Sequence, residues 1–169
     1  MSASGPVIAV MGVSGSGKTS LGRAIAARLD LPFLDGDDFH PPANVAKMAA
    51  GVPLTDEDRW PWLDRLGQAA ATEPRGAVVA CSALKRAYRD RLRAWRPDLI
   101  LVHIVGDATL IGRRMQGRRD HFMPASLLDS QFAALEPPAP DEAAIEAPAA
   151  LGPARQVELV CAELGRRGI

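Results

Sequence analysis

The residues best suited to chemistry lie close to the start of the chain. The segment from Gly12 to Thr19, GVSGSGKT, matches the phosphate-binding pattern G-x-x-x-x-G-K-[ST] at every fixed position. Its glycines allow the backbone to curl, so that successive amide N–H groups can point at phosphate oxygens. Lys18 would then place a cation on the β- and γ-phosphates, and the Thr19 hydroxyl would bind Mg²⁺. The segment predicts a site for a nucleoside triphosphate, but it does not by itself specify a kinase.

A cluster of carboxylates follows the next apolar run, in the sequence FLDGDDFH. If the strand continued through this cluster, Asp35 and Asp37 would lie on the same side, because side chains alternate along a strand. One carboxylate could hold Mg²⁺ through water, and the other could accept a proton from an attacking hydroxyl. Asp38 is expected to be exposed. A solvated acidic turn without chemical function is the alternative.

Further polar residues could bind a second substrate. His40, Asn44 and Lys47 recur at near-helical spacing, so they could share one face of a helix. For His40 a packed or capping role is the alternative. Lys85 and Arg89 stand four positions apart and could offer cations to a carboxylate or phosphate of that substrate.

Two other features complete the expected site. Ser82 follows an apolar run and is either a site residue or the N-cap of the next helix. The basic segment at residues 113–122 has the composition of a lid whose arginines stabilise a transferring phosphoryl group. A basic loop that faces solvent, RNA or a membrane is the alternative for that segment.

Strand-like apolar runs alternate with helical patterns along the chain. We expect strands at Val7–Met11 and at residues 31–34, 77–81, 99–105 and 143–147. We expect helices at residues 19–29, 41–50, 59–71, 84–95, 108–116, 125–135 and 153–167. This alternation predicts an α/β fold with a parallel sheet covered on both faces. Ligands of such sheets bind beyond the carboxyl ends of the strands, where the phosphate-binding segment and the acidic cluster both fall.

Composition limits the kind of protein. The 169 residues suit one domain, and 47% hydrophobic with 24% charged residues is typical of a globular chain. Twenty basic and twenty acidic residues give no net charge, which argues against a nucleic-acid partner held by bulk charge. No apolar run is long enough to span a membrane. The two distant cysteines, Cys81 and Cys161, are expected to be reduced thiols of a cytoplasmic protein.

Longer stretches of the sequence resemble the gluconokinases, small P-loop kinases related to shikimate and adenylate kinases. The stretches that carry the resemblance are MGVSGSGKT, FLDGDDFHPPANVAKMAAGVPLTDEDRWPWL, CSALKRAYRDRLR and RMQGRRDHFMPASLLDSQFAALEPP. The resemblance implies a three-layer P-loop kinase fold with a five-stranded parallel sheet in the order 2-3-1-4-5. It also implies a mobile lid at about residues 114–124 and a homodimer. Shikimate kinases carry three glycines where this chain has Cys81, Ser82 and Ala83.

The resemblance implies transfer of the γ-phosphoryl group of ATP, with Mg²⁺, to the 6-hydroxyl of D-gluconate, a reaction that feeds carbohydrate-acid catabolism. Together with the residue analysis it gives Lys18, Asp37 and Arg118 as catalytic residues, and Thr19 and Asp35 as metal ligands. The expected nucleotide-binding residues are Gly12, Val13, Ser14, Gly15, Ser16, Gly17, Lys18, Thr19, Ser20 and Arg114. The expected gluconate-binding residues are Asp37, His40, Asn44, Lys47, Arg59, Ser82, Lys85, Arg89 and His121, with the carboxylate of gluconate on Lys85 or Arg89.

Two alternatives stay open at this point. A kinase of the same fold could act on another small hydroxy acid, such as shikimate, or on a nucleoside monophosphate. A non-enzymatic ATP-dependent switch or binding module would bind nucleotide without turnover stimulated by gluconate. The acidic cluster, the cations and the lid-like segment favour an enzyme, because a switch needs no pocket for a second substrate.

Overall fold

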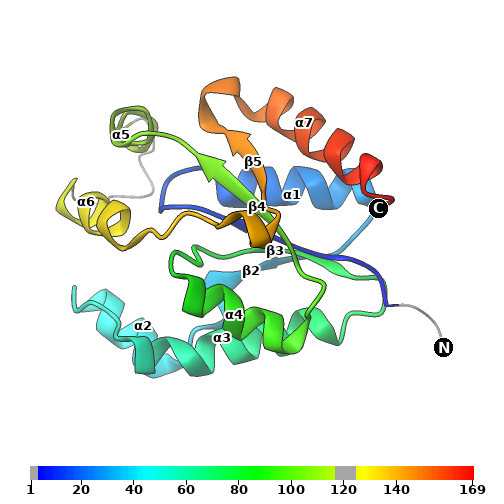
Figure 1. Ribbon diagram of the computed structural model, residues 1–169. Helices are drawn as coiled ribbons and strands as arrows, with labels where there is room; N and C mark the ends of the chain where they lie inside the picture. The colour runs from blue at the N-terminus through cyan, green and yellow to red at the C-terminus, as the bar shows by residue number, and fades with distance from the viewer. Residues whose placement is uncertain (1–3, 117–124) are drawn as a thin grey trace.

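The structure is a computed structural model that describes residues 4–116 and 125–169. Its sheet is parallel throughout and has the strand order β2-β3-β1-β4-β5 (Figure 1). The strands are β1 (Val7–Met11), β2 (Phe33–Asp35), β3 (Ala77–Ala80), β4 (Ile100–Val105) and β5 (Ile145–Pro148). The predicted α/β class and strand order are confirmed.

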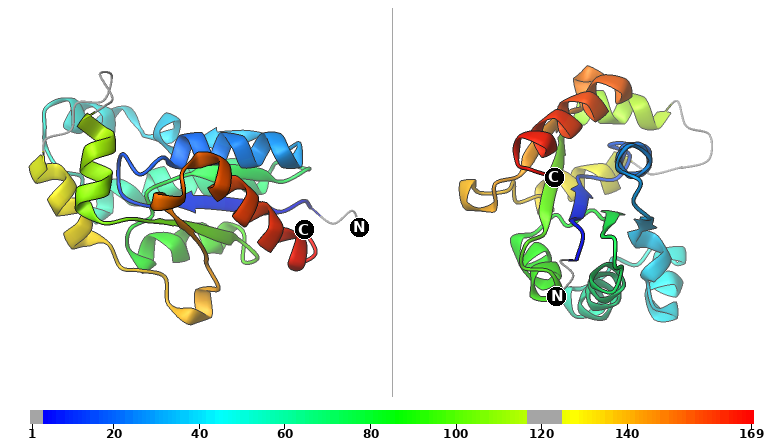
Figure 2. Two further views of the ribbon diagram at one scale, coloured as in Figure 1. Left: turned by 90° about the horizontal axis from the view of Figure 1, so that it is seen from above. Right: turned by 90° about the vertical axis from the view of Figure 1, so that its right-hand side faces the viewer.

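Helices cover both faces of this sheet. They are α1 (Lys18–Leu29), α2 (Pro42–Ala49), α3 (Asp56–Ala71), α4 (Arg86–Trp95), α5 (Ala108–Gln116), α6 (Ala125–Ala134) and α7 (Pro153–Arg166). Ile8 and Val10 of β1 pack in the cluster that contains residues of α1 and α7, whereas Val7 and Ala9 pack towards α3 and α4. The alternation of side chains along the buried strand therefore produces two separate hydrophobic layers. Figure 2 shows the sheet between these layers.

Several element boundaries differ from the sequence prediction, and those of α3 and β2 have local reasons. Helix α3 begins at Asp56 rather than at residue 59, because Thr55 and Asp58 form a reciprocal capping box. The Thr55 hydroxyl accepts from the Asp58 N–H at 3.2 Å, and the Asp58 carboxylate accepts from the Thr55 N–H at 2.9 Å. Strand β2 begins only at Phe33, because Asp30 adopts a left-handed conformation and the Leu31 N–H still bonds the carbonyl of Ala26.

Helix α4 begins at Arg86, two residues later than expected, and Lys85 occupies its N-cap position. Ala83 has a positive φ of 44°, so the chain turns between Ser82 and the helix instead of entering it directly. The alternative in which Ser82 caps this helix is therefore wrong.

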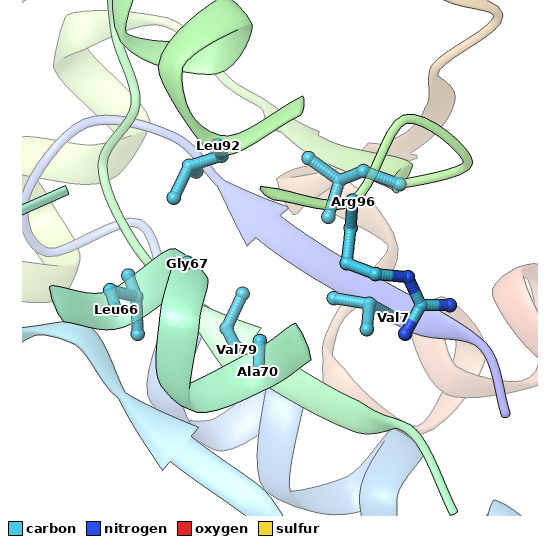
Figure 3. A pocket seen from close by; sticks show the side chains of 8 residues that line it. Val7, Leu66, Gly67, Ala70, Val79, Leu92 and Arg96 are labelled. Atoms are coloured by element: carbon cyan, nitrogen blue, oxygen red, sulfur yellow. The ribbon is translucent and has the colours of Figure 1, made fainter. Parts of the chain in front are cut away.

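A small cavity lies between α3, α4 and the sheet (Figure 3). Its lining is apolar except for Arg96, which donates through Nη2 to the carbonyl of Gly5 at 2.7 Å. Val7, the first residue of β1, also lines it, so the cavity is remote from the carboxyl ends of the strands. We regard it as a packing void in the core. Over the described ranges, no helix is both long and apolar enough to cross a membrane.

Candidate active site

The phosphate-binding segment connects the end of β1 to the start of α1. Gly17 adopts a φ of 100°, a conformation that side chains other than glycine rarely take. Within the part of the chain that the structure describes, no protein acceptor pairs with the amides of Gly15, Gly17, Thr19 and Ser20. Open backbone donors at the N-terminus of a helix form an anion-binding site. The loop therefore has the donors that phosphate oxygens require.

Other groups of the same loop are engaged with the protein. The Gly12 N–H donates to the Ser82 carbonyl at 3.3 Å, and the Ser16 N–H donates to the Val13 carbonyl at 3.2 Å. Lys18 Nζ donates to the Val13 carbonyl at 3.0 Å, which folds the cation back over the loop. Ser82 thus contacts the loop through its backbone carbonyl, and not through the side chain from which a site role was expected.

One contact to this loop was not predicted from the sequence. The Ser14 N–H donates to Oε1 of Gln131 at 2.6 Å, from a residue 117 positions away on α6. Gln131 lies inside one of the stretches that resemble gluconokinases, but no local pattern relates it to Ser14.

The acidic cluster has a different shape from the one predicted. Strand β2 ends at Asp35, and residues Gly36–Phe39 form a short 3₁₀ helix capped by Asp35, whose Oδ1 accepts from the Asp37 N–H at 3.0 Å. The strand therefore does not continue through the cluster, and the expectation that Asp35 and Asp37 lie on the same side of one strand is wrong. Gly36 passes so close to β3 that a Cβ would lie 2.5 Å from the carbonyl of Ala80. Glycine at this position allows the turn to pack against the sheet.

The acidic turn and the phosphate loop meet beside Cys81, whose thiol is buried. Cys81 directly follows β3, and burial raises its pKa to about 12. The Lys18 cation opposes this rise in pKa, while the carboxylates of Asp37 and Asp35 add to it. Asp35 pairs with Ala80 in the sheet register, and the Gly12 N–H donates to the Ser82 carbonyl at 3.3 Å, so the acidic turn and the phosphate loop both reach the carboxyl end of β3. This is the edge at which α/β sheets bind ligands.

His40 and Asn44 form the next part of the site. The His40 ring stacks on Trp62, with centroids 4.2 Å apart, and its Nδ1 lies 3.3 Å from Asn44 Nδ2. Burial lowers the pKa of His40, with an opposing influence from Asp37 and a smaller lowering by Arg59. The imidazole is therefore neutral at neutral pH, and because Nδ1 accepts from Asn44, Nε2 carries the proton.

The cations on this side are held by acidic residues. Lys47 Nζ lies 2.6 Å from Asp58 Oδ2, and the hydrogen bond from Lys47 is the main cause that lowers the pKa of Asp58 to about 2. A single oxygen of Asp56 faces both Lys85 at 3.5 Å and Arg59 at 3.9 Å. Because one carboxylate cannot neutralise two cations, this pair keeps a surplus positive charge suited to an anionic substrate.

Tyr88 supports that arrangement. Its hydroxyl donates to the same oxygen of Asp56 at 2.5 Å, and Arg59 lies over its ring at 5.2 Å. Sequence reasoning assigned no role to Asp56 or Tyr88. No local pattern in the sequence relates Tyr88 to Asp56, which lies 32 positions away.

Arg89 does not face this site, which corrects its assignment as a substrate-binding residue. It is fully buried, and its Nε and Nη2 atoms pair with Glu142 at 2.7 and 3.0 Å. Its Nη1 donates to the carbonyls of Ala83 at 2.9 Å and Leu84 at 3.2 Å. The reason is that Arg89 occupies the inner face of α4, where the segment before β5 supplies a buried carboxylate. It braces the turn after β3 from inside the protein.

The remaining predicted residues are placed only in part. Arg118 and His121 lie outside the described residues, as does the side chain of Arg114, whose backbone belongs to α5. The described segments contain no cluster of three His, Cys, Asp or Glu residues that could hold a metal ion. The Thr19 hydroxyl, the Asp35 carboxylate, phosphate oxygens and water are nevertheless the hard oxygen ligands that suit Mg²⁺.

The parallel sheet, the open amides between β1 and α1 and the convergent acidic turn define a P-loop phosphotransferase. A family model described as an AAA domain matches residues 7–138. The thermosensitive gluconokinase of Escherichia coli K12 is 50% identical over 136 residues, which are 79% of this chain and 73% of that protein. The gluconokinase of Gluconobacter oxydans is 50% identical over 142 residues, 82% of this chain and 79% of that protein.

A solved structure agrees with these relatives. A gluconokinase from Sinorhizobium meliloti 1021 superposes with a TM-score of 0.88 at 47% sequence identity, covering 95% of this chain and 92% of that one. The chain therefore belongs to the AAA-domain group of nucleotide-binding proteins and to the gluconokinase family. The resemblance stated from the sequence is confirmed.

Proposed function

We propose that the protein transfers the γ-phosphoryl group of MgATP to the 6-hydroxyl of D-gluconate, which yields ADP and 6-phospho-D-gluconate. The observation that carries this proposal is that the acidic turn beginning at Asp35 and the phosphate loop that holds Lys18 both meet the carboxyl end of β3. A surplus cation pair, Lys85 and Arg59, lies on the substrate side. Membership of the gluconokinase family supplies the identity of the second substrate.

The nucleotide side uses the phosphate loop. The open amides of Gly15, Gly17, Thr19 and Ser20 bind phosphate oxygens, and Lys18 leaves the Val13 carbonyl to reach the β- and γ-phosphates. The Thr19 hydroxyl and, through water, Asp35 would hold Mg²⁺, which would neutralise charge on the phosphates. Because phosphoryl transfer has a loose transition state, positioning and charge neutralisation contribute more than base strength.

The substrate side orients the sugar acid. Asp37 accepts a hydrogen bond from the primary hydroxyl and can take its proton, while the neutral His40 donates through Nε2 to another hydroxyl. Lys85 and Arg59 pair with the carboxylate of gluconate in exchange for part of their contact with Asp56. Asn44 and Lys47 complete this side by fixing His40 and the capped start of α3.

Further parts of the proposal concern the rest of the protein. Arg114, Arg118 and His121 belong to a lid over the transferring group. The whole chain acts as one catalytic domain, in a homodimer, in the cytoplasm. The reduced cysteines expected from the sequence support that compartment.

A coupled assay of ADP release tests the proposed function. With MgATP we expect turnover that is stimulated by D-gluconate and not by shikimate or nucleoside monophosphates. Stimulation by one of those other acceptors would instead identify a different kinase of this fold. Nucleotide binding without turnover on any of the acceptors would identify a switch or binding module.

The pH dependence of gluconate binding is a second prediction. Since burial lowers the pKa of His40 below its ordinary value of 6.5, the imidazole stays neutral above that pH. We expect the KM for gluconate to be constant from about pH 7 to 8.5 and to rise as the pH falls below about 6.5, because protonation of Nδ1 breaks its contact with Asn44. Initial rates across this range measure the effect. The variant His40→Gln should lose the rise at low pH, and a variant that kept it would contradict the assignment.

A further inference from the structure

We infer that Gln131 is a positioning residue for ATP, which holds the first half of the phosphate loop in its anion-binding shape by means of a neutral acceptor. The inference rests on the proposed function and adds a residue to its nucleotide site. Gln131 accepts the Ser14 N–H at 2.6 Å, a short contact between two segments 117 positions apart. No other hydrogen bond to this amide is formed among the described residues.

The contact divides the loop into two functional parts. The amides of Gly12, Ser14 and Ser16 donate to protein acceptors, whereas those of Gly15 and Gly17 have no acceptor among the described residues. An amide left without a partner inside a tight loop would favour a different backbone conformation. Gln131 removes that penalty for Ser14 and leaves the neighbouring donors available to phosphate.

Helix α6 is well anchored for this task. Leu128 packs with Val13, the loop residue next to Ser14, in a buried cluster that also contains Ile111 and Leu84. Immediately after the helix, the Glu136 N–H donates to the Leu84 carbonyl at 2.8 Å. Figure 1 shows α5 and α6 at the same end of the sheet as the loop between β1 and α1. The glutamine is therefore presented by a fixed element, as a positioning residue requires.

The neutrality of the acceptor matters because of its location. Gln131 Oε1 accepts from Ser14, the residue directly before Gly15, whose amide has no acceptor among the described residues. A carboxylate could accept from Ser14 equally well, but its charge would repel the triphosphate and weaken the positive field of the loop. A carboxamide keeps the acceptor without the charge, and its Nε2 retains donors of the kind that phosphate oxygens accept.

The test separates the hydrogen bond from the charge. The variants are Gln131→Met, which keeps the length and removes the acceptor, and Gln131→Glu, which keeps the acceptor and adds a charge. Asp129→Asn, exposed on the same helix, is the matched control. Isothermal titration calorimetry of each protein with MgATP and with MgADP gives the dissociation constants without gluconate. Melting temperatures and the steady-state KM and kcat complete the comparison.

We expect Gln131→Met to weaken MgATP binding about tenfold, which corresponds to the loss of one well-formed hydrogen bond, and to leave the KM for gluconate within about twofold. Gln131→Glu should melt near the wild-type temperature, because the Ser14 contact survives. It should nevertheless bind MgATP at least as weakly as the methionine variant, with a smaller loss for MgADP, which carries less charge.

Several outcomes would overturn the inference. Wild-type MgATP affinity in Gln131→Met would show that the contact only packs α6 against the loop. Tighter MgATP binding in that variant would show that Gln131 competes with phosphate. If Gln131→Met does not fold, Gln131→Glu decides, since wild-type affinity in it would refute the requirement for a neutral acceptor. A wild-type protein that binds ATP but does not phosphorylate gluconate would refute the proposed function and leave this test intact.

Discussion

Substitution of Lys18 by methionine is expected to lower kcat for gluconate phosphorylation by about 10³-fold, in line with the loss of a main electrostatic contact to a transferring phosphoryl group. Methionine has nearly the same length as lysine but lacks the ammonium group. In the structure that group donates to the Val13 carbonyl at 3.0 Å. Coupled ADP-release kinetics at saturating ATP and gluconate measure the effect.

The matched control for this experiment is Asp38→Asn. Asp38 is exposed beside Asp37 in the acidic turn, and we expect kcat to stay within about twofold of wild type, as is usual for surface substitutions away from the chemistry. Circular dichroism spectra and melting curves of both variants should match those of the wild type. Near-normal kcat in Lys18→Met would mean that the triphosphate binds elsewhere than in the loop at residues 12–19.

Substitution of Glu142 by glutamine is expected to lower the free energy of unfolding by about 3–5 kcal/mol, the usual cost of removing one partner of a buried ion pair. Glu142 accepts from Arg89 at 2.7 and 3.0 Å and from Arg93 at 2.5 Å, and its side chain is 1% exposed. Glutamine fits the same space but removes the carboxylate that pairs with the buried Arg89 guanidinium, while Arg93 keeps Asp90 at 2.8 Å. Urea denaturation followed by tryptophan fluorescence measures the loss.

Glu163→Gln is the control for that variant. Glu163 also faces two arginines, Arg166 at 2.7 Å and Arg167 at 3.2 Å, but on the surface of α7. Because exposed ion pairs contribute little, its substitution should barely change the unfolding midpoint. Below its melting temperature Glu142→Gln should keep the wild-type KM for gluconate. A raised KM for gluconate with unchanged stability would indicate that Arg89 does contribute to substrate binding.

The same ion pair makes stability depend on pH. Burial by itself would raise the pKa of Glu142, but hydrogen bonds from Arg89 and Arg93 outweigh burial and bring that pKa to about 2, below its ordinary value of 4.5. A lowered pKa in the folded state means that the contribution to stability is complete above about pH 4.5 and disappears as the pH falls towards 2. Unfolding free energies over this window should therefore fall more steeply for the wild type than for Glu142→Gln.

Local patterns in the sequence were sufficient to predict those parts of this protein whose conformation depends on neighbouring residues. The loop at residues 12–19 could be predicted because its glycines, its lysine and the flanking strand and helix are contiguous. The strands and helices followed from their periodicity, and errors at their ends arose where a capping box at Thr55 or a left-handed residue such as Asp30 shifted a boundary. The order of the strands was available through the family resemblance and was confirmed.

Only the tertiary structure decided which way side chains point when their partners are distant in the chain. Arg89 and Lys85 stand on the same helix pattern, yet Glu142 holds Arg89 inside the protein from 53 positions away, while Asp56 keeps Lys85 at the surface of the site. Gln131 meets Ser14 across 117 positions. The physical reason is that a short stretch of sequence fixes backbone conformation through its own torsions and hydrogen bonds. The partner of a polar side chain is instead chosen when whole elements pack together and every buried charge or amide must be satisfied.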